Sequence, residues 1–115
     1  MIPLSRRDVE HAVADALDTI PPALLAQLDN VVILVEDEPE PGLEDCLGVY
    51  EGVPLTERHL GNPFLPDRII VFAGPTLRAC SSLAELRREV AVTVVHEIAH
   101  YFGIDDDRLT ELGWD

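Results

Sequence analysis

Two histidines and a glutamate in the last quarter of the chain, His96, Glu97 and His100, form the pattern HExxH. Residues four apart lie on nearly the same face of an α-helix, about 6 Å along its axis. A helix here would therefore point both imidazoles at one ion. Glu97 would project from the adjoining side, close enough to a metal-bound water to take its proton. The spacing predicts a metal site with a general base beside it.

Zinc suits this donor set, because a catalytic zinc uses imidazole and carboxylate ligands and keeps three protein ligands plus one position for water. Bound zinc lowers the pKa of that water from about 15.7 to about 7. A third ligand is then required. Gly103 can take a left-handed conformation and turn the chain sharply, which lets Asp106 return to the metal. Asp105 and Glu111 are alternative ligands, because the three consecutive aspartates could instead cap a final helix.

The histidines also have a plain structural interpretation. His96 and His100 could be hydrogen-bonded residues of a central helix with no metal between them. A buried Glu97 without a cation or partner would then be costly, so a metal explains three polar residues in one step. The other two histidines, His11 and His59, are expected on the surface.

The segment that carries the motif is expected to be a helix through the middle of the domain. Ser82 offers an N-cap with Glu85 at the capping-box distance, and Gly103 is a natural stop. The β-branched run 90–95 would suit a strand equally well, but the good helix formers before it favour a helix. The second half is apolar nearly all round, which is typical of a helix that runs through the middle of a domain.

The rest of the chain is expected to form shorter elements around this helix. The acidic stretch 36–45 reads as a solvated loop whose geometry nothing fixes, and 56–67 reads as a second loop. The remaining predictions are a helix from a Ser5 cap to Ile20, a helical turn in 23–28, strands at 31–35, 47–55 and 68–73, the last stopped by Gly74-Pro75, and a closing helix at 105–114 that Leu112 and Trp114 pack against the central helix.

Length and charge narrow the class of protein. A chain of 115 residues fits one domain, which we expect to span residues 1–115. Eight Arg and no Lys stand against 22 acidic residues, a net charge of 8 − 22 = −14. Such a surface repels phosphate backbones and counts against nucleic-acid binding. The charge serves solubility, or alternatively it attracts basic substrates.

The cysteines and the apolar runs point to an ordinary cytoplasmic protein. Cys46 and Cys80 do not make a disulfide framework, and they read as two thiols in a reducing compartment. The first residues lack the pattern of a signal peptide. The longest apolar run, 31–35, is far too short to cross a membrane, so no membrane association is expected.

With these residues in view, the chain resembles the small bacterial zincin-like metallopeptidases, or minimal zincins, whose motif is HExxHxxGxxD. The resemblance is carried by residues 47–58, 65–75 and above all 85–114. It implies an α/β (α+β) fold with a small mixed sheet of three to four strands beside the metal-bearing helix. It implies one zinc ion held by His96, His100 and Asp106, with Glu97 as the base. It implies peptide-bond hydrolysis but supplies no substrate.

The chain also resembles the metzincins in the HExxHxxG portion but departs from them in two ways. Asp106 stands where their third histidine would be, and the one methionine is Met1, so no methionine turn can lie beneath the metal. Nine residues follow Asp106 in the sequence, so we expect no subdomain that would wall a cleft from below. We therefore expect the domain to act on short peptides or unfolded proteins, or to need a protein partner that completes the cleft.

Two functions of other classes compete with the peptidase. One bacterial family of metal-dependent endoribonucleases carries three histidines at nearly this spacing, with Gly in place of Glu97 and His in place of Asp106. The presence of Glu97, the presence of Asp106 and the net charge of this chain all favour the peptidase. The second competitor is a non-catalytic binding module whose zinc is structural or vestigial, which the lack of a lower wall to the cleft would favour. Glu97 counts against it, because a structural site closes with a fourth ligand and needs no base.

Overall fold

The computed structural model describes residues 3–28, 30–52 and 66–112, which form a three-stranded mixed sheet packed with helices. The strands are β1 (Val31–Glu36), β2 (Gly48–Glu51) and β3 (Asp67–Phe72), in the order β1-β3-β2. β1 runs parallel to β3, and β2 runs antiparallel to it. The expected small mixed sheet is confirmed, although residues 53–55 of the predicted second strand and most of the predicted loop 56–67 lie outside the described residues.

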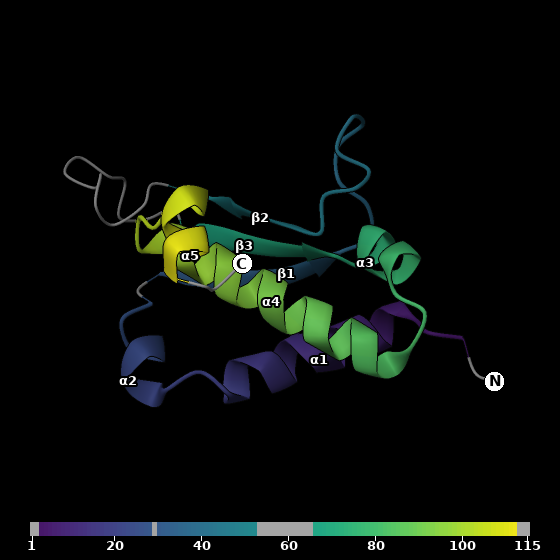
Figure 1. The fold of residues 1–115 in the computed structure, drawn as a ribbon, viewed down its shortest axis with the longest axis horizontal. Coiled ribbons are helices and arrows are strands. Elements are labelled where there is room, and N and C mark those ends of the chain that lie inside the picture. The colour runs from purple at the N-terminus through teal and green to yellow at the C-terminus, as the bar shows by residue number, and fades with distance from the viewer. Residues whose placement is uncertain (1–2, 29, 53–65, 113–115) are drawn as a thin grey trace.

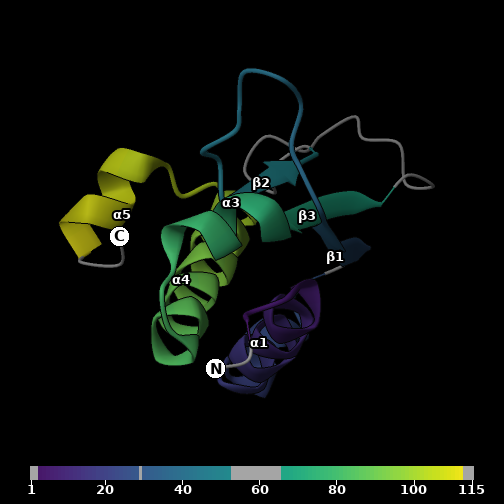
Figure 2. The same cartoon turned by 90° about the vertical axis from the view of Figure 1, so that its right-hand side faces the viewer.

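Two long helices cover one face of this sheet. α1 (Arg6–Asp18) and α4 (Leu83–Tyr101) lie side by side beneath the strands (Figures 1 and 2). α1 begins at the predicted Ser5 cap, whose backbone N–H donates to Asp8 Oδ2 at 2.8 Å. The core between helices and sheet is built from aliphatic side chains of both layers, including Val9, Val13, Ile69, Val71, Leu86, Val90, Val94 and Ile98.

The central strand is buried on both faces. Ile69 and Val71 point into the helix-facing core, while Ile70 and Phe72, on the opposite face, are only 2% and 6% exposed. The register places Gly48 opposite Val71 and Tyr50 opposite Ile69. Side chains alternate along a strand, so Gly48 and Tyr50 of the edge strand β2 face the helices.

Three short helices complete the described fold: α2 (Pro22–Leu25), α3 (Ala73–Ala79) and α5 (Asp106–Leu112). α3 is a correction. Gly74-Pro75 was expected only to end the preceding strand, yet the pair lies inside the first turn of a helix, where proline is tolerated because the N–H it lacks would be unpaired anyway. The hydroxyl of Thr76 donates to the Phe72 carbonyl at 2.7 Å and supports this turn.

The acidic loop is held in place, contrary to expectation. Arg78 of α3 donates to both oxygens of Glu38, at 2.9 and 3.0 Å, and to the carbonyl of Glu44 at 2.9 Å. Arg6 of α1 likewise reaches Asp37 at 2.9 Å. A side chain at Gly74 would collide with Glu38. The loop between β1 and β2 is therefore exposed but anchored to two helices.

The central helix α4 packs against α1 and the sheet, as expected for a helix through the middle of the domain, but one side of it is open to solvent. Val92 and Val95 are 42% and 37% exposed, because the sheet and α1 cover only one side of a long helix. These two side chains line an apolar groove of about 410 Å³ against the end of α1 and α2, with Thr19, Ile20, Pro21, Leu24 and Ala91.

Candidate metal centre

α4 positions the two histidines and the glutamate. The helix begins at Ser82, whose hydroxyl oxygen accepts the backbone N–H of Glu85 at 3.1 Å, as the sequence predicted. Fourteen residues later His96 and His100 project from one side of the helix, with ring centroids 4.6 Å apart. Their side chains are 26% and 28% exposed, so solvent and an ion can reach them.

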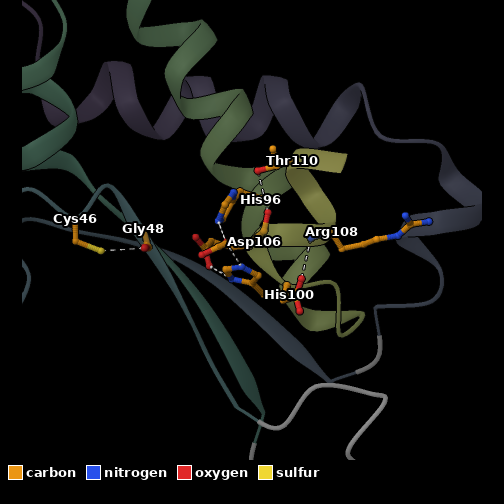
Figure 3. A network of polar contacts seen from close by, with 9 residues as sticks. Cys46, Gly48, His96, His100, Asp106, Arg108 and Thr110 are labelled. Carbon is orange, nitrogen blue, oxygen red and sulfur yellow. Dashed lines mark hydrogen bonds and ion pairs between the residues drawn. The ribbon is translucent and has the colours of Figure 1, made fainter. Parts of the chain in front are cut away.

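The turn after α4 brings Asp106 back to these rings. Gly103 has a φ of 82°, in the left-handed region that favours glycine, and the Ile104 N–H donates to the Ala99 carbonyl at 3.0 Å. α5 then starts at Asp106. Oδ1 of Asp106 lies 2.9 Å from Nε2 of His96 and 2.9 Å from Nε2 of His100 (Figure 3).

The two alternative ligands have other partners. Asp105 Oδ1 accepts the backbone N–H of Arg108 at 2.9 Å and so caps α5. Glu111 pairs with the Arg108 guanidinium at 2.8 Å. Both roles expected of the aspartate run therefore occur, but in neighbouring residues: one aspartate caps the helix and the next contacts the histidines. The assignment of Asp106 as a metal ligand stays a prediction.

Glu97 lies deeper than the histidines. It is 6% exposed, and its Oε1 is 3.0 Å from Nδ1 of His100. The edge strand β2 passes directly over it. A Cβ built on Gly48 would be 3.7 Å from Glu97 Cγ and 2.5 Å from Thr93 Cγ2, so strand and helix approach as closely as they do because Gly48 has no side chain.

In the metal-free protein, the groups around the cluster favour an ion pair between protonated His100 and ionised Asp106. Burial alone would lower the pKa of His100, but its hydrogen bond to Asp106 and the negative charge of Glu97 raise that pKa above its usual 6.5. The hydrogen bond from His100 in turn lowers the pKa of Asp106 below 3.8. A proton held on His100 therefore competes with any metal for Nε2.

Sequence reasoning missed three residues around this cluster. Gly48 is one. Cys46 is another: its thiol donates to the Gly48 carbonyl at 3.1 Å. The third is Leu109, which is fully buried and anchors α5; Leu109 could have been found as the apolar residue three positions after Asp106. The expected anchors, Trp114 and the side chain of Leu112, lie outside the described part, as does His59, while His11 is exposed as expected.

Comparison with known proteins agrees with this arrangement. The family model for zincin-like metallopeptidases matches residues 28–114, so the chain belongs to the zincin-like metallopeptidase family. The solved structure of a conserved hypothetical protein from T. thermophilus is similar, with a TM-score of 0.62 and 25% identity over 96% of this chain and 100% of that one. No curated protein matches the chain. The expectation of one domain over residues 1–115 stays a prediction.

The donor set fits the metal that the family implies. His96, Glu97 and His100 each offer a ligand atom within 4.8 Å of the others, and Asp106 adds a carboxylate oxygen between the two imidazoles. Ligands around a tetrahedral zinc at about 2.0–2.1 Å stand about 3.3 Å apart. The observed 2.9 Å between Asp106 Oδ1 and each Nε2 thus needs to open by only a few tenths of an ångström.

The structure also bears on membrane association. Among the residues it describes, no helix combines the length and the apolar composition needed to cross a bilayer.

Proposed function

We propose that this chain is a zinc-dependent peptidase, with His96, His100 and Asp106 holding the ion and Glu97 acting as general base. The observation that carries the proposal is the position of Asp106 Oδ1, 2.9 Å from Nε2 of both histidines, with a buried glutamate one residue after the first of them. Membership of the zincin-like metallopeptidase family supports it.

A bound zinc supplies an activated water and polarises the carbonyl that is attacked. The chain's own residues supply the rest. Glu97 takes a proton from the attacking water and passes it to the nitrogen of the leaving amine. Its burial beneath β2 keeps bulk water from its carboxylate. The i, i+4 spacing of His96 and His100 places both imidazoles on one side of α4, where they would hold the ion.

We further propose that the substrate is an extended peptide lying along β2. The Phe72 N–H donates to the Leu47 carbonyl at 2.9 Å, and hydrogen-bonded pairs alternate along an antiparallel ladder. The N–H of Gly48 therefore faces away from β3, at the level of Glu97, and the Gly48 carbonyl on the same side accepts the Cys46 thiol. An extended peptide can add to such an edge through main-chain hydrogen bonds. Short peptides and unfolded proteins meet this requirement, and the net charge of −14 disfavours nucleic acid as a substrate.

The test uses zinc-loaded protein, a library of unstructured peptides and mass spectrometry of the products. Glu97→Gln is the matched control, because glutamine keeps the size of the side chain but cannot accept the proton. We expect the parent to cleave and the variant to lose 10²–10⁴-fold in rate while keeping its zinc. Equal rates would place the base elsewhere. A zinc-loaded parent that cleaves nothing would favour a non-catalytic binding module.

A further inference from the structure

Both nitrogens of the His100 ring have carboxylate partners. Nε2 lies 2.9 Å from Asp106 Oδ1, on the side where the metal is proposed (Figure 3). Nδ1 lies 3.0 Å from Glu97 Oε1. For His96 the structure gives a polar contact at Nε2 only, among the residues that it describes. The two histidines are therefore held differently.

The contact at Nδ1 matters for metal binding. A neutral imidazole carries one N–H, and a metal on Nε2 requires that proton to be on Nδ1. A carboxylate only accepts hydrogen bonds, so Glu97 selects the tautomer in which Nδ1 is protonated and Nε2 presents its lone pair. Groups that hold a ligand histidine in this way typically contribute 10–100-fold to metal affinity.

The surroundings make this contact well defined. Glu97 and His100 are three residues apart on α4, so the helix backbone sets their separation. The Glu97 side chain is 8% exposed, and Gly48 of β2 covers it, since a Cβ built on Gly48 would lie at ordinary contact distance, 3.7 Å, from Glu97 Cγ. Few solvent molecules can compete for Oε1 in that position.

We infer that Glu97 is also the positioning residue for His100, with one carboxylate oxygen on the imidazole N–H and the other available for the proton of the attacking water. This inference rests on metal binding by His96, His100 and Asp106, as in the proposed function, but it does not require peptide hydrolysis. It separates two properties of Glu97: hydrogen-bond acceptance, which glutamine retains, and basicity, which glutamine loses.

Zinc affinity tests the inference, measured by competition with a chromophoric chelator for the parent, Glu97→Gln and Glu97→Ala. We expect Glu97→Gln to stay within a few-fold of the parent and Glu97→Ala to bind 10–100-fold more weakly. Glu89→Ala removes the same charge two turns earlier on α4 and is the matched control, expected to equal the parent. Melting of the metal-free proteins checks that each variant folds.

A second measurement reports on the ring itself. Long-range ¹H–¹⁵N correlation spectra of the zinc-loaded parent should show His100 protonated at Nδ1, with a slowly exchanging proton that persists in Glu97→Gln and is lost in Glu97→Ala. Equal zinc affinity of Glu97→Ala and Glu89→Ala would overturn the inference. So would a Glu97→Gln variant as weak as Glu97→Ala, which would make the carboxylate itself a ligand. A parent that binds no zinc would instead remove the proposed function.

Discussion

At the scale of single residues, three consecutive aspartates have three different environments. Asp105 caps α5, Asp106 contacts both histidines, and Asp107 is exposed with neither role. We expect Asp106→Ala to weaken zinc binding by at least 100-fold, since loss of an orienting group alone costs 10–100-fold. Asp105→Ala should instead lower the free energy of unfolding by about 1 kcal/mol through loss of the cap, and Asp107→Ala should change neither. Chelator competition and urea unfolding separate these outcomes; equal losses of zinc affinity would reduce the run to a generic acidic cluster.

The same residues give the metal-free protein a dependence on pH. The folded pKa of His100 is raised, so its contribution to stability is complete below 6.5 and is lost as pH rises through that folded pKa. The folded pKa of Asp106 is lowered, so its contribution is present above 3.8 and is lost as pH falls through the folded value. With chelator present, the difference in melting temperature between parent and Asp106→Asn should be largest between about pH 4 and 6.5. A difference that grows above pH 7 would contradict this pairing.

At the scale of elements, the close approach of β2 to α4 depends on Gly48, which has no side chain. A Cβ at Gly48 would lie 2.5 Å from Thr93 Cγ2 and 3.0 Å from the Ile70 carbonyl oxygen. Gly48→Ala should therefore cost about 1–3 kcal/mol, the usual range for overpacking. Thr93→Ser removes Cγ2 but keeps the hydroxyl that donates to the Glu89 carbonyl, so the double variant should recover part of the loss. Urea unfolding of the four proteins gives the coupling energy, and strict additivity would mean that the strand simply moves away.

The elements also show what the sequence could and could not predict. α4 was predicted to its ends, because its Ser82 cap, its apolar spacing and Gly103 are local signals. The HExxH motif and the turn after it also pointed to Asp106, whose Oδ1 lies 2.9 Å from both histidines, while its role as a ligand stays a prediction. α3 was missed because Gly74-Pro75 is a strong stop signal, and its use inside a helix depends on contacts made by later residues. Gly48 could not be recognised, since its importance comes from Thr93, which is distant in the sequence and adjacent only in the fold.

At the scale of the whole molecule, α4 and α5 differ in how much of their described surface is buried. α4 lies in the core between α1 and the sheet, whereas α5 buries Leu109 and exposes its other described side chains. Within the described residues, α5 is also attached by the polar contact of Asp106 with the histidines, which a metal would replace with coordination bonds. Amide hydrogen exchange over 106–112 should therefore slow markedly when zinc is added, while exchange in α1 changes little. Equal protection with and without zinc would mean that coordination of Asp106 adds nothing to the attachment of α5.

The closeness of these donors along the chain has a consequence for folding kinetics. All the proposed ligands lie within residues 96–106, so bringing them together closes only a short loop and costs little chain entropy. Most of the sheet, by contrast, pairs segments more than twenty residues apart. Zinc can thus bind before the sheet has formed and help to nucleate the turn between α4 and α5. In a denaturant series, zinc should raise the folding rate and not only lower the unfolding rate. An effect confined to the unfolding rate would mean that the ion enters only after the molecule has folded.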